Sequence, residues 1–119
     1  MRVEELRNYV ETNFSIPTYA NDFYSLSETN CAMVRTTPAA TTSPHVNHLN
    51  FQILIRNEKA KEADSKAWEI YEELRVKTRF SVGRANVIRC FANQPLYVGQ
   101  DDSGRTLYSI NCNVITDAK

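Results

Sequence analysis

The sequence predicts an α+β fold, in which two helices pack on one face of a mainly antiparallel sheet of four or five strands. Two amphipathic helical patterns and several runs of alternating apolar residues lead to this prediction. They occur in the order helix, two strands, helix, and then two or three strands. The chain has 119 residues, which is the length of a single domain over residues 1–119 with one core.

The first helix is predicted from apolar residues that recur at intervals of three and four. Val3, Leu6, Tyr9 and Val10 share one side, while charged residues such as glutamate fill the other. The helix should end near Asn13, because Pro17 follows closely and disfavours helical backbone in the residue before it.

The second helix is predicted over residues 60–74 from an apolar stripe surrounded by lysine and glutamate. The stripe consists of Ala60, Ala63, Ala67, Ile70, Tyr71 and Leu74. Its small alanines suit close packing on a sheet, and Trp68, just off the stripe, is expected at the rim of the core or in an oligomer contact.

Alternation of apolar and polar residues predicts the strands. One strand is predicted around residues 49–55, and others over residues 31–35, 87–92 and 106–116. In the last strand, one face consists of Tyr108, Ile110, Cys112 and Val114. Residues 14–28 show no clear period and stay unassigned.

The segment from Thr36 to Asn47, rich in threonine, proline, alanine and serine, is interpreted as a long connection between two strands. Two interpretations remain: a mobile arm that orders against a neighbouring subunit, or an inert hairpin loop. The candidate assembly residues in it are Thr36, Thr37, Thr41, Thr42 and His45.

A second candidate surface consists of basic residues that follow the second helix, namely Lys77, Arg79, Arg84 and Arg89. They are candidates to face a central pore, an acidic partner or passing DNA. The alternative is a solvated cluster, favoured near a helix C-terminus by the helix dipole.

Charge and cysteine content exclude several classes of protein. Fourteen basic residues balance fourteen acidic ones, which argues against a protein that mainly coats nucleic acid or an anionic membrane. The three cysteines are widely spaced and odd in number, so we expect free thiols and a reducing cytoplasm. We predict neither a signal peptide nor a membrane-spanning segment.

The motifs of catalysis and cofactor binding are not found in the sequence. Its glycines are Gly83, Gly99 and Gly104, and they form neither a dinucleotide fingerprint nor a phosphate loop. His45 and His48 lack nearby zinc-ligand partners, and Asp101 and Asp102 precede Ser-Gly in a predicted turn. We therefore predict that the protein is not an enzyme and has no cofactor or metal.

Three blocks, in this order, resemble the minor-capsid and tail-terminator family of tailed bacteriophages, which includes tail-completion and head–tail connection proteins. The first is the N-terminal amphipathic helix. The second is the strand 51–56 followed by the helix 60–74, which contains Trp-Glu-Ile-Tyr at 68–71. The third is the stretch 94–111, with its Asp-Asp-Ser-Gly turn.

This resemblance implies a structural assembly protein of a phage or prophage, a virion component assembled in the bacterial cytoplasm, that caps the tail tube and forms the docking surface for the head connector. The implied partners are further copies in a homo-hexameric ring, the tail tube protein and a head-completion or connector protein, with DNA only in passing and no membrane. One alternative is a head-completion or head–tail joining protein whose basic residues line the DNA channel. Another is a small cytoplasmic ligand-binding or enzymatic α+β domain.

Overall fold

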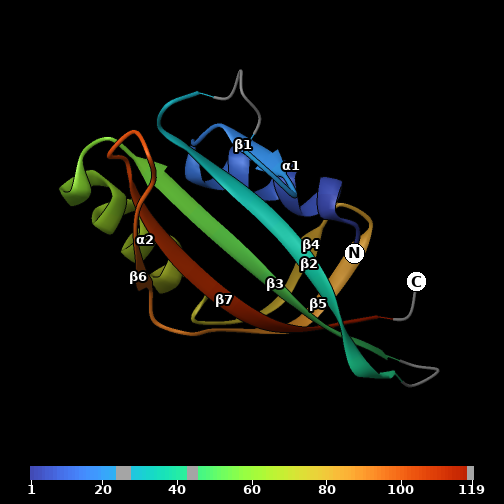
Figure 1. Cartoon of the computed structure of the whole chain (residues 1–119). Helices are drawn as coiled ribbons and strands as arrows, with labels where there is room; N and C mark the ends of the chain where they lie inside the picture. Colours follow the sequence, from blue (N-terminus) through green and yellow to red (C-terminus); the bar gives the residue numbers. More distant parts are fainter. Residues whose placement is uncertain (24–27, 43–45, 118–119) are drawn as a thin grey trace.

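Each of two helices is followed by a run of strands in the computed structural model, which describes residues 1–23, 28–42 and 46–117 (Figure 1). The elements are α1 (Val3–Phe14), β1 (Thr18–Ala20), β2 (Cys31–Thr42), β3 (Val46–Asn57), α2 (Ala60–Leu74), β4 (Val76–Val82), β5 (Ala85–Ala92), β6 (Leu96–Gln100) and β7 (Thr106–Asp117). The predicted α+β class is confirmed, and both predicted helices are present.

All strands belong to one sheet, in the order β1-β2-β3-β7-β5-β4. The β1–β2 pair is parallel, and the other pairs are antiparallel. Along one edge, β7 pairs with β3 over its whole length. Its other edge is shared between β5 and β6, which meet β7 at opposite ends. Between them lies Pro95, which has no N–H to donate to a ladder.

The predicted number of strands is wrong, because the sheet has seven within the residues that the structure describes. Strand β1 lies in the unassigned region and, with three residues, is too short to show a period. Strand β4 follows α2 at the edge of the sheet, where charged side chains are tolerated and hide the alternation. Within it, Arg79 has a left-handed backbone with φ of 53° and interrupts the regular pattern.

The predicted long connection over residues 36–47 is also wrong. Strand β2 continues to Thr42, β3 begins at Val46, and the two remain paired as far as Thr42 and Asn47. The threonines that suggested a loop are β-branched and favour extended backbone. Pro38 is tolerated because β1 pairs with β2 only near Val34, so the outer side of β2 has no ladder there in the part of the chain that the structure describes.

Both helices pack on the same face of the sheet and form one core with it. Leu6 and Val10 of α1 and Ile70 of α2 are buried against alternate residues of the central strands, such as Ile53 and Ile110. Helix α1 contacts β1 and β2 at one edge of the sheet and β4 at the other. The sheet therefore curls around the helices, and its other face is the outside of the molecule (Figure 1).

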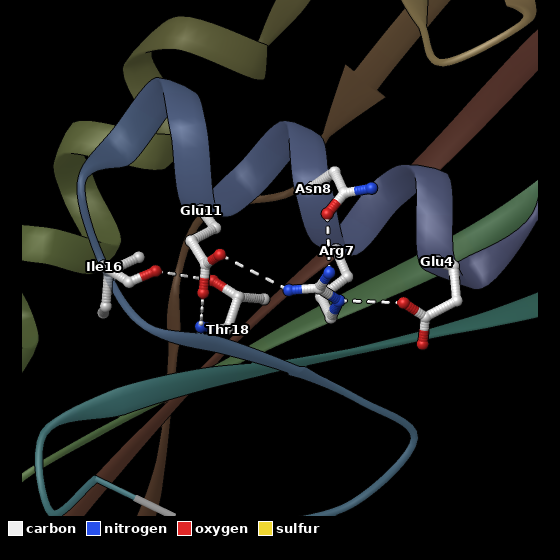
Figure 2. Close-up of polar contacts among 6 residues, drawn as sticks. All are labelled: Glu4, Arg7, Asn8, Glu11, Ile16 and Thr18. Atoms are coloured by element: carbon white, nitrogen blue, oxygen red, sulfur yellow. Dashed lines mark hydrogen bonds and ion pairs between the residues drawn. The ribbon is translucent and has the colours of Figure 1, made fainter.

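Side chains of α1 fasten the helix to the adjacent edge strand, as Figure 2 shows. The Glu11 carboxylate accepts a hydrogen bond of 3.0 Å from the backbone N–H of Thr18, the first residue of β1. Arg7 donates to Glu4 at 2.9 Å and to Glu11 at 3.4 Å, so one guanidinium holds two carboxylates on the same face. The helix ends at Phe14 because Ser15 adopts left-handed backbone, with φ of 51°.

Candidate assembly surface

The outer face of the sheet is polar in its central part. On β2, β3 and β7, residues that alternate with the core point outward, and five of them carry long polar side chains. They are Arg35, Asn50, Gln52, Asn111 and Asn113. Since an amide group both donates and accepts hydrogen bonds, this face can bind polar groups of either kind.

Two shallow hollows on this face join into one groove. The first, of about 230 Å³, is lined by Arg35 and the amide residues. The second, of about 220 Å³, extends to Arg89 and Phe91 on β5, and both hollows include Asn50 and Asn113. We call this groove the outer trough, and its members are Arg35, Thr37, His48, Asn50, Gln52, Arg89, Phe91, Asn111 and Asn113.

Several side chains of the outer trough are held in place by their neighbours. Gln52 donates a hydrogen bond of 2.8 Å to the Ser109 hydroxyl, which also accepts one of 3.2 Å from Asn111. At the other end, the guanidinium of Arg89 lies 4.2 Å from the centre of the Phe91 ring, a cation–π contact. A partner would therefore meet a largely ordered surface, which lowers the entropic cost of binding.

The four predicted basic residues do not form one patch. Lys77 faces the helices, where it donates to the Glu73 carboxylate and, at 3.3 Å, to the Tyr9 hydroxyl. The hydrogen bond to Glu73 raises the pKa of Lys77 above its usual value. Arg79 and Arg84 are exposed along edge strand β4 and in the turn that follows it. Arg89 alone of the four lies in the outer trough.

Two of the predicted assembly residues, Thr36 and Thr37, lie on opposite faces of β2. Thr36 is half-buried and lies opposite Phe51, whereas Thr37 is exposed, lies opposite Asn50 and lines the outer trough. Thr41 and Thr42 are the last residues of β2. His45 lies outside the described residues.

Exposed apolar side chains on β6 were missed by the sequence analysis. Leu96, Tyr97 and Val98 are 60%, 56% and 51% exposed, although they belong to a strand. Among the residues that the structure describes, β7 is the strand that pairs with β6, and it does so along one edge. The signal in the sequence was an apolar triplet directly after Pro95, in a run too short to alternate.

Trp68 lies on α2 and is 37% exposed, in line with a position at the rim of the core. Its ring contacts that of Tyr71 edge to face, with centroids 5.3 Å apart. A partly exposed tryptophan held by an aromatic neighbour is typical of residues that dominate binding at protein interfaces.

Charge is segregated between the two layers. The helices carry eight carboxylates and three basic side chains, whereas the strands carry one carboxylate and five basic side chains. The balanced total therefore conceals an acidic helical layer and a basic sheet. Arg56 is buried and Lys77 pairs with Glu73, so Arg35, Arg79 and Arg89 are the exposed basic side chains of the strands.

Within the described ranges, no three His, Cys, Asp or Glu side chains lie close enough together to hold a metal ion. The helices of the same ranges are too short or too polar to cross a lipid bilayer.

Comparison with protein families decides the class of this protein. The family described as bacteriophage tail terminator protein matches residues 16–118, from the approach to β1 to the end of β7. The chain belongs to this family. The tail-terminator resemblance predicted from the sequence is thereby confirmed, and family membership implies that the protein is a component of the phage virion.

A solved structure supports the fold of this tail terminator. It is 16% identical in sequence, has a TM-score of 0.57, and the alignment covers 93% of this chain and 88% of the other. At this level of identity, the similarity concerns the fold alone. A search of curated proteins returns no match.

Proposed function

We propose that this tail terminator caps the end of the tail tube as a homo-hexameric ring and forms the surface on which the head-side connector docks. Family membership over residues 16–118 is the observation that carries the proposal. Assembly takes place in the bacterial cytoplasm, where a chain whose described cysteines are free and buried needs no oxidising environment.

A ring of identical subunits requires two different surfaces on each copy, because each copy must bind one neighbour on either side. This chain offers several surfaces of that kind: the outer trough, the acidic helical layer and the apolar edge of β6. A cap must also bind the tube on one side and the connector on the other. The exposed β6 strand is our candidate for one of these contacts, since exposed strand edges and apolar patches are common docking sites.

The channel-lining alternative requires a single basic surface that faces DNA. Lys77 is committed to Glu73 and Tyr9, and Arg89 lies on a different part of the sheet from the β4–β5 turn that contains Arg84. The arrangement therefore supports a cap better than a DNA-lining joint.

The test uses purified tube protein that polymerises in vitro, with and without this protein. A cap blocks further addition at the end that it binds, so we expect shorter tubes and additional density at one end in negative-stain images. Light scattering over a concentration series measures the mass of the free protein in parallel. Tubes of unchanged length without density at their ends would contradict the proposal.

A further inference from the structure

We infer that the exposed side of helix α2 of one copy docks in the outer trough of the next copy. This inference rests on the proposed function, because it names the contact by which the ring closes. Its occupant is a second copy of the same chain, and the argument for this occupant is charge complementarity within a chain of zero net charge.

The outer trough is the basic partner. Arg35 and Arg89 stand near its two ends, and both are exposed. The single carboxylate in the strands is Asp117, at the end of β7, where the Asn86 side chain donates to it at 2.8 Å. An acidic surface that enters the trough therefore meets guanidinium and amide donors without a facing cluster of carboxylates.

Helix α2 is the acidic partner. Its exposed side carries Glu62, Ser65, Glu69 and Glu72, at intervals of three and four residues that place them in one stripe. The last turn contains acidic residues and no basic one, although the negative end of the helix dipole favours cations there. Lys77 of β4 already pairs with Glu73, and Lys66 with Glu69 at 3.3 Å. Glu72 is in no ion pair with the residues that the structure describes, so it is the carboxylate that a guanidinium from a neighbouring copy would neutralise.

The charges on the two sides are separated by comparable distances. Arg35 and Arg89 lie on strands separated by two others in the sheet, about 14 Å across the strands. The register also sets Arg35 level with Asn111 and Arg89 level with Ile115, an offset of about 13 Å along β7, so the two backbones lie about 19 Å apart. From Glu62 to Glu72, the helix rises by about 15 Å. An α2 helix laid diagonally across the trough can therefore place a carboxylate within reach of each long arginine side chain.

An aromatic contact adds to the electrostatic one. Trp68 lies beside the acidic stripe and is partly exposed, and Phe91 provides an exposed ring in the outer trough. Binding hot spots are commonly formed by a tryptophan that fills a groove and by arginines close to it. Because the helix and the trough are different surfaces of one chain, the contact is heterologous and propagates around a ring.

The test reverses each charge set separately. Arg35→Glu/Arg89→Glu makes the trough acidic, and Glu69→Arg/Glu72→Arg makes the helix basic. Each double variant now sets like charges against each other, so we expect self-association to weaken about 100-fold or more. An equimolar mixture of the two restores assembly in alternating order, because each kind of junction is again of opposite sign.

Two measurements monitor assembly, both for the protein in solution and for the protein on tail tubes. Light scattering gives the mass, and Trp68, the only tryptophan, becomes protected from acrylamide quenching when it docks. Arg79→Glu/Arg84→Glu is the matched control for the trough variant, since it lowers the net charge by the same amount at exposed residues outside the trough, and it should assemble like the wild type. Far-ultraviolet circular dichroism and the unfolding midpoint verify that every variant is folded.

Outcomes separate this contact from the proposed function. If the wild type caps tubes and both reversed variants still form rings, or if the mixture fails to restore them, the contact is wrong and the capping function stands. If rings obey the charge exchange but bind no tube, the contact stands and the capping function fails. A wild type that remains monomeric both in solution and on tubes overturns the inference.

Discussion

The carboxylate of Glu5 accepts a hydrogen bond from the backbone N–H of Arg84, which lies 79 positions further along the chain. The same side chain accepts a bond of 2.8 Å from the backbone N–H of Arg2 at the start of α1. Glu5 therefore ties the first helix to the turn between β4 and β5 and helps to hold the far edge of the sheet against the helices.

These hydrogen bonds predict a pH-dependent contribution to stability. The backbone N–H of Arg84, followed by that of Arg2, lowers the pKa of Glu5 in the folded protein. A carboxyl group whose folded pKa is lowered stabilises the fold above its unfolded pKa of about 4.3, and this contribution is lost as pH falls through the folded value. We expect Glu5→Gln to lower the free energy of unfolding at pH 7 by about 1 kcal/mol. Denaturant unfolding of the wild type and of Glu5→Gln at several pH values measures this difference.

The loss in Glu5→Gln should shrink as the pH falls below about 4, because protonation then removes the same interaction from the wild type. Glu4→Gln is a suitable control, since Glu4 lies in the same helical turn but is exposed and pairs with Arg7. A difference between wild type and Glu5→Gln that stays constant from pH 7 to pH 3 would contradict the assignment.

Gly83 is predicted to be intolerant of a side chain for two reasons. Its φ of 58° lies in the left-handed region, and an added Cβ would collide with the Glu5 carboxylate. We expect Gly83→Ala to lower the free energy of unfolding by about 1–2 kcal/mol from backbone strain, and by more because the Glu5 hydrogen bond to Arg84 is displaced.

Gly104→Ala separates the two effects. Gly104 also has positive φ, at 78°, but an added Cβ there meets no atom within 4 Å. The decrease in the free energy of unfolding of Gly104→Ala should therefore report the backbone strain alone. Equal losses in the two variants, measured by chemical denaturation, would show that the collision with Glu5 is relieved without cost.

The parts of the fold that the sequence predicts well are those with one buried side. Helix α2 has the predicted bounds because its apolar stripe recurs at the helical period, and Ile110 and Cys112 share the predicted face of β7. Edge strands lack this signal. In β4, Lys77 and Phe80 lie toward the helices although one of them is charged, and Arg79 breaks the alternation.

The candidate surface was harder to predict because it depends on which strands become neighbours. Arg35, Asn50 and Asn113 come from three strands that are distant in sequence and meet only through the sheet order. Proximity in sequence groups the basic residues, yet Lys77 and Arg89 point to opposite faces of the sheet. Faces are set by register and bulges, which one sequence does not reveal.

Burial predicts that truncating an apolar side chain costs much more stability in the core than on the exposed strand β6. Ile53 is fully buried between Val34 and Ile110 in the ladder, so Ile53→Ala should lower the free energy of unfolding by about 2–5 kcal/mol. Leu96→Ala removes a similar volume from the exposed β6 strand and should cost less than about 1 kcal/mol. Thermal and denaturant unfolding of the monomer give the free energy of unfolding of both variants. Similar losses in the two variants would mean that β6 is packed more tightly than the structure indicates.

The thiols provide a test of the core that requires no substitution. Cys31, Cys90 and Cys112 are buried and free. The hydrogen bond with Cys90, together with burial, holds the pKa of the Cys112 thiol above its usual range, and burial raises the pKa of Cys31. The hydrogen bond with Cys112 instead lowers the pKa of the Cys90 thiol, so the protection of Cys90 rests on its burial. Since the thiolate is the reactive form and the reagent must reach it, we expect all three thiols to resist alkylation at pH 8 in the native protein and to react quickly in denaturant. Mass spectrometry counts the modified thiols over time, and rapid alkylation of Cys112 in native buffer would show that the β5–β7 region opens readily.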